Sequence, residues 1–556
     1  MGEVRLGDAR LDRRLLETAT RMADRPTATN TQRLDWNELR GLYRVAHAPR
    51  AQPNILQETH RLRTRQRMDA CPGRVLLVHD TTELDFTSHP AAHHCLGPIG
   101  TGGGFGFLQH NSLAFDPEGK QILGLAFQQL VKRKPQPEGE TRDERARRAD
   151  KESRLWLEGI RGIGLAPAAA RWIHVCDRGG DFFEAMQLVR ERHQEFLIRI
   201  HQDRRVVVTG VDEETEEELE VMQSLHATIR GITSAATKVV TVASRGGRPA
   251  REVKVQIGSR PAILQPPQPD GARRGLRPLQ VTPIRVWEEG VEEARAAAAS
   301  AKAAARAAEQ TAKAAEKTAK AAETAVAAAK EKEAWDEALA ESVAAREAAG
   351  TAKAAAVVAK EKAKAAATRV ARYLDWWLGT NGPIETVADV ERAVSDYEWR
   401  WPVAEEYHEV EKSGLKIESQ RFESYGPLAA ALAILAVVAI RVLQLRYARD
   451  SHPEASAETI ATPEEIEMAG RATRRIGRVL SVKQFVDAVA RLGGHLGRKG
   501  DGPPGWATLW RGYQRLKDML LGAELMRETA GGDPSDDENT PRDSPDGGRS
   551  APSRCK

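Results

Sequence analysis

An alanine-rich segment at residues 291–371 constrains the fold of this chain more than any other feature. It contains no proline, and three consecutive sevenfold repeats, AARAAEQ, TAKAAEK and TAKAAET, fill residues 304–324. Because alanine and lysine favour helix, the segment predicts a helix, which would extend about 120 Å at ~1.5 Å per residue if it were straight. Gly350 is a plausible point at which it folds back as a hairpin. Alanine buries little apolar surface, so we expect an arm or spacer with weak coiled-coil packing and no chemistry of its own.

The length and charge of the chain leave its class open. With 556 residues it is too long for one compact core, so we expect several domains. The net charge of +4, from 83 basic and 79 acidic side chains, neither requires nor excludes a nucleic-acid partner. Arginine is concentrated in residues 1–70, 132–154 and 471–515, and the end of the chain is acidic.

Cysteine usage and apolar runs favour a cytoplasmic protein without a membrane partner. The four cysteines are far apart and form no CxxC pair: Cys71, Cys95, Cys176 and Cys555. A disulfide framework is therefore not expected, and a reducing bacterial cytoplasm, in association with the nucleoid, fits better. The N-terminus lacks the apolar core of a secretory signal. The apolar run Leu428–Ile440 is only 13 residues long and predicts a buried helix rather than a membrane span.

Residues 1–70 have apolar positions at helical spacing, which predicts a helical domain. Its arginines give it a basic surface that either contacts DNA or is simply solvated: Arg13, Arg14, Arg21, Arg25, Arg33 and Arg40.

Strands mixed with helices occupy residues 74 to 200. We expect strands at 74–82, 171–180 and 196–200, a hairpin of 105–115 and 121–131, a helix from about Arg142 to Glu158 that stops at Gly159, and a helix from about Asp181. This order predicts an α/β domain with a mixed sheet. Residues 204–290 read mainly as β-strands and are interpreted as a β-rich insertion.

Helical spacing returns at residues 384–445, and a helix at 505–525 closes the final domain. Residues 528–556 are rich in Gly, Pro, Ser and Asp and are expected to be disordered.

Two aspartates occupy the polar ends of the expected central strands. Asp80 comes after the apolar run RVLLV, and Asp177 after RWIHVC. Carboxylates at the ends of adjacent strands can converge and hold a pair of Mg²⁺ ions with open positions for water and phosphate. Equally, an aspartate at a strand end can merely begin a turn, so the two aspartates alone are suggestive but not decisive.

The most specific pattern lies at residues 397–414, which read YEWRWPVAEEYHEVEKSG. It resembles the signature Y-x2-R-x3-E-x6-K of insertion-sequence-4 family DDE transposases, the family that includes the transposase of transposon five. HDTTELDF at 79–86 is similar to the first catalytic Asp segment of that family, and VCDRGGDFF at 175–183 to the second. The resemblance covers about residues 1–290 and 372–525.

This resemblance implies a ribonuclease-H-like catalytic core with Asp80, Asp177 and Glu405 as the catalytic carboxylates that hold Mg²⁺ (or Mn²⁺). It also implies cleavage of double-stranded DNA at transposon ends and joining of the freed 3′ ends to target DNA, by a homodimer. Five positions match residues that contact DNA in the family: Tyr397, Arg400 and Lys412 at phosphates, Arg199 as a further basic contact, and Trp376 stacked on a flipped base. For Arg199, a solvated strand end is an almost equally good explanation.

The resulting domain prediction divides the chain into seven parts. They are a helical DNA-binding domain (1–70), the first part of the catalytic core (71–203), the β-rich insertion (204–290), the alanine-rich helical insert (291–371), the rest of the core with the Glu-bearing helix (372–450), a C-terminal helical domain (451–527) and the disordered tail (528–556).

Ala404 is a departure from the signature. Four residues rather than three separate Arg400 from Glu405, because Ala404 is extra. In a continuous helix one inserted residue rotates all later side chains by about 100°. Pro402 could instead start the helix afresh and absorb the extra residue before Glu405.

The run EEYH offers Glu406 as an alternative third carboxylate. The six residues between Glu405 and Lys412 agree with the signature, so we choose Glu405. Three functions remain open: an active transposase, an inactive DNA-binding relic of one, and a plain metal-dependent nuclease.

Other patterns are weaker. A group of possible zinc ligands has no second cluster at regular spacing and is interpreted as loop residues: His89, His93, His94 and Cys95. The glycines at 102–106 lack the Lys-Ser/Thr of a phosphate loop, which favours a flexible turn. Asp85, Asp116 and Asp181 suit turn or cap roles. Trp506 and Trp510, four residues apart, are expected in the C-terminal core.

Overall fold

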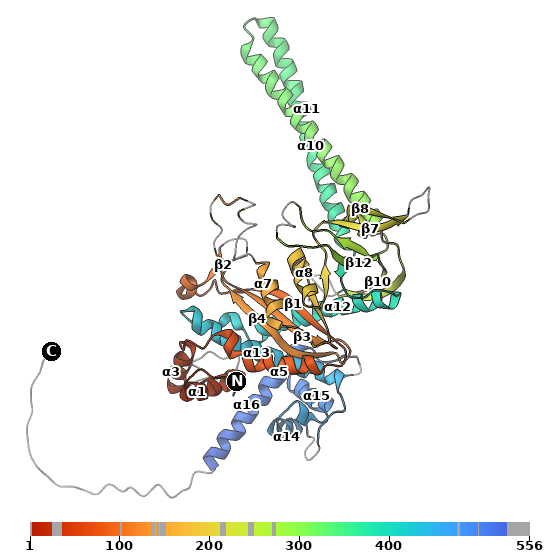
Figure 1. Ribbon diagram of the computed structural model, residues 1–556. Coiled ribbons are helices and arrows are strands. Elements are labelled where there is room, and N and C mark those ends of the chain that lie inside the picture. Colours follow the sequence, from red (N-terminus) through yellow and green to blue (C-terminus); the bar gives the residue numbers. More distant parts are fainter. Residues whose placement is uncertain are drawn as a thin grey trace, which may run out of the picture.

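The computed structural model describes residues 3–24, 36–100, 103–134, 137, 139–141, 144, 152–211, 218–242, 250–268, 274–474, 479–498 and 500–530. Figure 1 shows a central sheet, a long helical arm projecting from one end and a group of helices at the other end. Arg25, Arg33, Cys555, most of the helix expected at 142–158 and the tail from residue 531 lie outside the described residues.

Thirteen strands of the described chain form one mixed sheet. Their order along it is β2-β3-β1-β5-β6-β13-β12-β11-β7-β8, with β4 beside β3, β10 beside β12, and β9 beside β10. The strands are β1 (Arg74–Asp85), β2 (Gly97–Ile99), β3 (Gly104–Asp116), β4 (Gln121–Val131), β5 (Arg171–Cys176), β6 (Glu195–Arg199), β7 (Arg205–Val211), β8 (Glu218–Ser224), β9 (Ala236–Val242), β10 (Arg251–Ser259), β11 (Ala262–Leu264), β12 (Leu279–Glu288) and β13 (Asp375–Thr380). The predicted α/β class with a mixed sheet is confirmed.

Helices cover both faces and both ends of this sheet. They are α1 (Ala9–Asp24), α3 (Trp36–Ala46), α4 (Pro53–Leu56), α5 (Glu58–Ala70), α7 (Arg154–Ile163), α8 (Phe183–Glu191), α9 (Leu225–Arg230), α10 (Val291–Ala328), α11 (Lys332–Val370), α12 (Val387–Glu409), α13 (Tyr425–Ser451), α14 (Pro463–Ala472), α15 (Val482–Leu492) and α16 (Trp506–Ala530). Helices α12 and α13 pack on one face of the sheet, and α7 and α8 pack on the other.

Parallel pairing of β1 with β5, and of β5 with β6, forms the centre of the sheet. The register sets His79 beside Cys176 in the last pair between β1 and β5. The next residue of each chain segment, Asp80 and Asp177, therefore lies at the same level of the sheet. Strand β1 continues to Asp85 because it stays paired with β3 to that point. Asp80 therefore lies within the strand, and its predicted place at the strand end was wrong.

A buried polar chain holds β1, β3 and β5 together on the face opposite Asp80. His79 Nε2 lies 2.8 Å from His174 Nδ1, and its Nδ1 lies 2.8 Å from Ser112 Oγ. His110 contacts Thr81 at 2.8 Å, and His174 contacts Gln194 at 3.0 Å. Burial lowers the pKa of His110 to about 3 and that of His174 to about 4, so both rings are neutral near pH 7.

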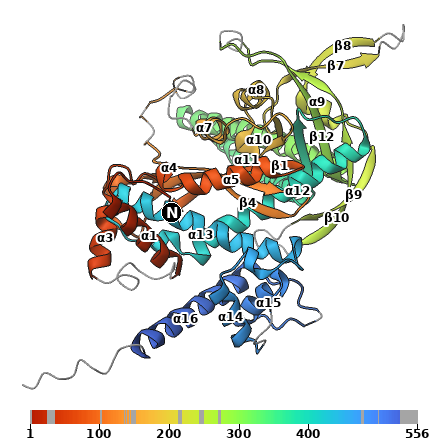
Figure 2. The same cartoon turned by 60° about the horizontal axis from the view of Figure 1, so that its bottom comes forward.

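Helix α13 is the apolar core helix that the sequence predicts. By length and composition it could cross a membrane, alone among the helices of the described residues, but 78% of its apolar window is buried inside the protein. Helices α1, α3 and α4 pack against it, and Gln57 Nε2 donates to Ala433 O at 3.1 Å. Helix α5 packs along β4 (Figure 2).

Two expected helix boundaries were wrong. Helix α7 passes through Gly159 and ends at Ile163, capped by Gly164, whose positive φ of 93° suits a glycine. Gly159 is instead a packing residue, because a Cβ there would lie 3.1 Å from His110 Nε2. In the alanine-rich segment the chain reverses at residues 329–331, whereas Gly350 lies within α11.

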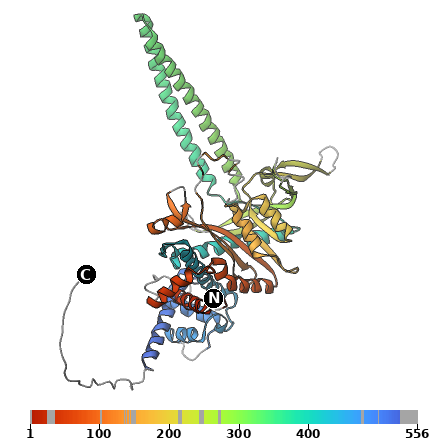
Figure 3. The same cartoon turned by 60° about the vertical axis from the view of Figure 1, so that its left-hand side comes forward.

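The segment between β6 and the arm extends the central sheet rather than forming a separate layer. Strand β12 pairs with β13, which pairs with β6. Helices α10 and α11 come after β12 and return the chain to β13, so the arm projects from this edge of the sheet (Figure 3).

Candidate active site

The strand register brings Asp80 and Asp177 together. Asp177 begins a short 3-10 turn after β5 and accepts a hydrogen bond from Gly179 N at 2.8 Å. Burial raises the pKa of the Asp177 carboxyl, and the negative charge of Asp80 raises it further. A buried carboxylate beside a second negative charge is suited to bind a cation.

Helix α12 crosses over these aspartates and is anchored to β1 at two levels. A bidentate pair joins Arg74 to Asp396, with Nε–Oδ2 at 2.9 Å and Nη2–Oδ1 at 3.1 Å. One turn further along, Arg400 Nη1 donates to Asp80 Oδ1 at 3.2 Å. These contacts fix the rotation of the helix before Pro402.

His408 continues the same face of α12. Its Nε2 lies 2.9 Å from Asp80 Oδ2, so Arg400 and His408 both contact one carboxylate. Residues 400, 404 and 408 are spaced by four and share a side of the helix. The middle residue is Ala404, which is buried.

Glu405 lies one position away from this face. Helix α12 is continuous from Val387 to Glu409 with Pro402 inside it, so the extra residue is not absorbed before Glu405. Glu405 is exposed, and the neighbouring Glu406 pairs with Arg446 at 2.9 Å, away from Asp80. Within the described residues, no three His, Cys, Asp or Glu side chains are grouped so as to hold a metal ion. The structure thus brings together two of the three predicted carboxylates.

Three further residues of the site, His408, Glu411 and Gln109, were not predicted from the sequence. Burial lowers the pKa of His408, but its contacts with Asp80 and Glu411 outweigh that effect and raise the pKa to about 9. A protonated His408 donates to Asp80, and its Nδ1 lies 3.7 Å from Glu411 Oε2. Gln109 Nε2 donates to the buried Glu411 at 2.8 Å. The only sequence signal was that His408 and Glu411, three residues apart, lie inside the signature stretch.

Tyr397, Arg199 and Trp376 gather beside Asp177 and Arg400. The Tyr397 ring lies 5.6 Å from the Trp376 ring and 5.7 Å from Arg400 Cζ. Tyr397 Oη is buried and has no hydrogen-bond partner among the described residues. Burial raises the pKa of Tyr397, and the nearby charges of Arg400 and Arg199 oppose this. All the predicted DNA contacts except Lys412 therefore form one cluster, although Tyr397 is buried and Trp376 only half-exposed.

Arg178 is a further basic residue of this cluster that was not predicted from the sequence. It is exposed, directly succeeds Asp177 and is close enough to lower the pKa of Arg199, after the larger effect of burial.

Lys412 lies in a single π-helical turn, Val410–Gly414, at the end of α12. Its Nζ donates to Glu83 O at 2.5 Å and lies 3.4 Å from Glu418. It is half-buried.

The weaker candidates serve local structure. His93, His94 and Cys95 contact backbone carbonyls of their own loop at 2.9, 3.0 and 3.1 Å. Asp116 accepts from the backbone of its turn, and Asp181 accepts from two backbone N–H groups and Arg204. Gly102 lies outside the described residues.

Comparison with known protein families gives a match in the C-terminal helices. Residues 437–531 match the family model described as the transposase Tn5 dimerisation domain. The match begins inside α13 and includes α14, α15 and α16, and it supports a relationship to Tn5-type transposases and a function related to transposition.

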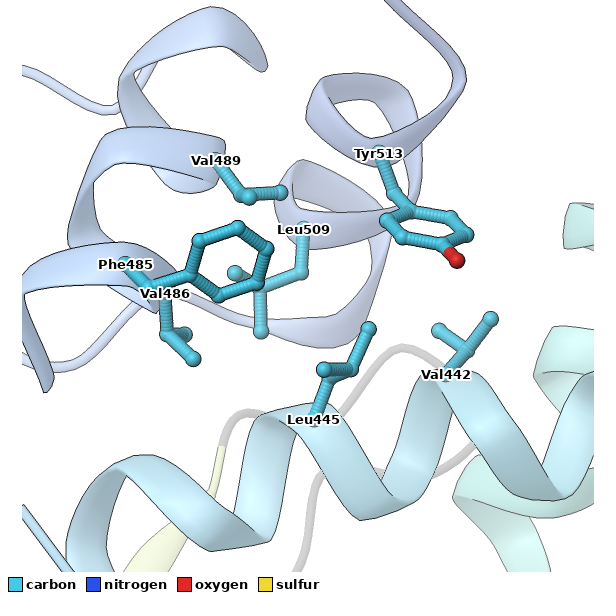
Figure 4. A pocket seen from close by; sticks show the side chains of 7 residues that line it. All are labelled: Val442, Leu445, Phe485, Val486, Val489, Leu509 and Tyr513. Atoms are coloured by element: carbon cyan, nitrogen blue, oxygen red, sulfur yellow. The ribbon is translucent and has the colours of Figure 1, made fainter. Parts of the chain in front are cut away.

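The dimerisation-domain match has a compact apolar centre. Side chains from α13, α15 and α16 line a small pocket between these helices: Val442, Leu445, Phe485, Val486, Val489, Leu509 and Tyr513 (Figure 4). Trp510 is buried in this domain, and Trp506 packs at its edge with Nε1 donating to Glu409 at 2.6 Å. The domain is thus attached directly to the end of α12, and Trp510 lies in the predicted core, whereas Trp506 lies at the edge of that core.

Proposed function

We propose that this chain is a DDE transposase that binds transposon ends, cuts DNA strands and joins the freed 3′ ends to target DNA. The observation that carries the proposal is the pairing of β1 with β5, which holds Asp80 and Asp177 together beneath Arg400 and His408. The dimerisation-domain match at residues 437–531 supports the same family. The mixed sheet, with an antiparallel β3–β4 hairpin beside the parallel strands β1, β5 and β6, supports a ribonuclease-H-like core.

Asp80 and Asp177 fit a divalent cation, Mg²⁺ or Mn²⁺. The raised pKa of Asp177 reflects burial and the adjacent charge of Asp80, and a cation between the two carboxylates would relieve both effects. When bound, divalent ions supply activation of the attacking oxygen and stabilisation of the leaving one. The chain itself contributes carboxylate oxygens from two fixed strands.

The residues around the aspartates are suited to hold DNA phosphate. Arg178 is exposed, Arg199 is half-buried, and the half-buried Lys412 presents a point charge beside Glu83 of β1. Arg400 is already engaged with Asp80, so its predicted phosphate contact requires a shared or exchanged hydrogen bond. Trp376 is half-exposed beside Tyr397 and can offer only part of its ring to a flipped base.

We propose that Glu405 is the third carboxylate and that its displaced position makes strand cleavage slower than it would be without Ala404. It lies one helical position beyond the face that contacts Asp80, and Ala404 occupies the position on that face. Pro402 lacks a backbone N–H and interrupts the hydrogen bonding of α12 just before Glu405, which makes a local shift of the helix at this point less costly.

Ala404 also favours a second candidate function, a DNA-binding protein derived from a transposase that no longer cuts. In this case Asp80 stays bound to Arg400 and His408, and the basic residues retain the DNA.

Strand cleavage of DNA that carries the ends of the element, with Mg²⁺ or Mn²⁺, separates the candidates. If the proposal holds, the wild-type chain cuts, and Asp80→Ala abolishes cutting while end binding persists. A matched control is Asp85→Ala, which removes an exposed carboxylate of the same strand that bonds only locally to Thr87. End binding without any cleavage that depends on Asp80 would support the second candidate, and cleavage without end specificity or joined product would indicate a plain nuclease.

A further inference from the structure

The arm packs against itself through small side chains only. Every third or fourth residue from Ala294 to Ala322 of α10 faces α11, and the same spacing recurs from Ala338 to Ala366 of α11. All of these positions are alanine except Ser342. Such a seam lets two helices approach closely and leaves no role for larger apolar residues inside the hairpin.

Larger apolar side chains nevertheless lie on α11, outside the seam. Trp335, Leu339, Val343 and Val357 are 42%, 38%, 50% and 58% exposed, and Val358, 55% exposed, lies about 100° further round the helix than Val357. The spacing of four, four and fourteen residues sets the first four along one flank of the helix, which at Val343 and Val357 is about a third of a turn from the alanine seam. One exposed apolar residue is ordinary, but a row of four along one flank is the pattern of a helix that has a partner.

Gly350 lies at the middle of this row, seven residues from Val343 and seven from Val357. A Cβ added at Gly350 would meet nothing within 4 Å, so packing against α10 does not require a glycine. Glycine destabilises a helix interior relative to alanine, which the rest of the segment uses freely. A glycine at the centre of an exposed apolar row suits the close approach of another backbone.

Charges on α11 are segregated about the same glycine. From residue 333 to 347 the helix has five acidic side chains and one basic one, Arg346, which pairs with Glu323 at 2.6 Å. From residue 353 to 369 it has five basic side chains and one acidic one. The half near the tip of the arm is therefore acidic, and the half near the sheet is basic.

We infer that α11 pairs antiparallel with α11 of a second copy of this chain, across a two-fold axis at Gly350. Residues equally distant from Gly350 then face each other, so Val343 lies opposite Val357 of the other copy. Glu347 lies opposite Lys353, and Asp336 opposite Lys364. A parallel arrangement would instead oppose like charges along the whole helix.

DNA is a poorer occupant of this surface. A phosphate backbone would be repelled by the acidic half of α11 and would leave Trp335 and Leu339 uncovered.

Cysteine cross-linking of the full-length chain tests the pairing. Gly350→Cys sets a thiol at the two-fold axis, where its symmetry mate is within disulfide reach. Ala348→Cys is the matched control, because residue 348 is exposed on the opposite side of α11. We expect mild oxidation to give a disulfide-linked dimer with Gly350→Cys, reversed by reductant, at a yield well above those of Ala348→Cys and the wild-type chain. Equal yields for the two variants, or none for Gly350→Cys, would overturn the inference.

Charge exchange in the Gly350→Cys chain tests the antiparallel register. Glu347→Lys opposes two like pairs across the axis and should slow cross-linking about tenfold, equivalent to ~1.4 kcal/mol. Adding Lys353→Glu restores opposite charges and should return the rate to within about twofold of the parent. A double variant as slow as the single one would contradict the register. Loss of DNA binding by Lys353→Glu, without cross-linking of the parent, would show that the arm contacts DNA instead. Neither readout involves DNA cleavage, so the result is independent of the proposed function.

Discussion

The two strands that carry Asp80 and Asp177 and the helix that carries Glu405 position their carboxylates in different ways. In β1 and β5, backbone pairing and the His79–His174 contact fix the register, so an aspartate cannot shift without breaking several bonds at once. In α12 each residue rotates the next by about 100°, and one inserted residue changes which side chain faces Asp80. A strand scaffold therefore protects the geometry of a site, whereas a helix makes it depend on residue count.

The same comparison explains why Ala404 does not disturb the fold. Arg74–Asp396 and Arg400–Asp80 anchor α12 before Pro402, and His408–Asp80 anchors it afterwards. These contacts are satisfied by an uninterrupted helix, in which alanine is the best helix former. The structure is preserved, and only the residue presented to the aspartates changes.

The largest effect that we predict is on catalysis by the strand-borne pair. Asp177→Ala should lower strand cleavage by a factor on the order of 10³–10⁴, as expected for loss of a catalytic group. Because burial and Asp80 raise the pKa of Asp177, its ionised form is disfavoured, so the same variant should unfold no earlier than the wild type near pH 7. Single-turnover cleavage measures the loss of rate, and thermal unfolding measures the stability of the variant. A large loss of stability together with the loss of cleavage would mean that Asp177 is structural.

The second prediction concerns acid sensitivity of the strand scaffold. His110 and His174 have folded pKa values of about 3 and about 4, below the unfolded value of 6.5, and His79 is lowered in the same direction. Because the unfolded chain takes up these protons first, stability should fall as the pH drops from about 6.5 towards 4, by about 1.4 kcal/mol per pH unit for each histidine. Urea unfolding of metal-free protein at several pH values measures the slope. His110→Gln, which keeps polar atoms, should reduce it, and an unchanged slope would argue against neutral buried histidines.

The third prediction tests the contact that fixes the strand register. His79→Ala removes the partner of both His174 and Ser112 and leaves buried polar atoms unsatisfied. We expect a loss of about 3 kcal/mol in the free energy of unfolding. Denaturant unfolding near pH 7 measures it, with His94→Ala, an exposed histidine whose ring contacts Ala91 O of its own loop, as the control. A loss no larger than that of the control would show that backbone pairing alone holds the strands.

The fourth prediction, of smaller size and opposite pH dependence, concerns the helix. The folded pKa of His408 is about 9, above the unfolded value of 6.5, so its ion pair with Asp80 stabilises fully below pH 6.5 and is lost as the pH rises through 9. His408→Gln should cost about 2 kcal/mol at pH 6 and close to nothing above pH 9. The free energy of unfolding of the metal-free wild type and of the variant, measured between pH 6 and above pH 9, checks this prediction. A difference that is constant with pH would mean that His408 is neutral.

The sequence was informative where local pattern determines structure. Apolar runs predicted β1, β5, β6 and the β3–β4 hairpin, and alanine content predicted the helices of the arm. Spacing could not locate the reversal of the arm, because the chain turns at residues 329–331, which have no turn residue, while Gly350 remains helical.

The site itself could be predicted only in part. Asp80 and Asp177 were identified from strand ends and the family signature, although β1 proved longer than its apolar run. The partners of Asp80 could not be foreseen, because they depend on how α12 is rotated over the sheet. That rotation is set by tertiary contacts, among them those of Asp396, Arg400 and His408. The family signature contains Glu405 but cannot show which way it points.

Deletion of Ala404 tests the contrast between strands and helix most directly. The deletion moves Glu405 into the helical position that Ala404 now occupies, on the face of α12 that contacts Asp80. We predict that strand cleavage in the presence of Mn²⁺ rises about tenfold or more, and that Glu405→Gln in the deleted chain removes the gain. Unchanged cleavage after the deletion would contradict the claim that helix register limits this site.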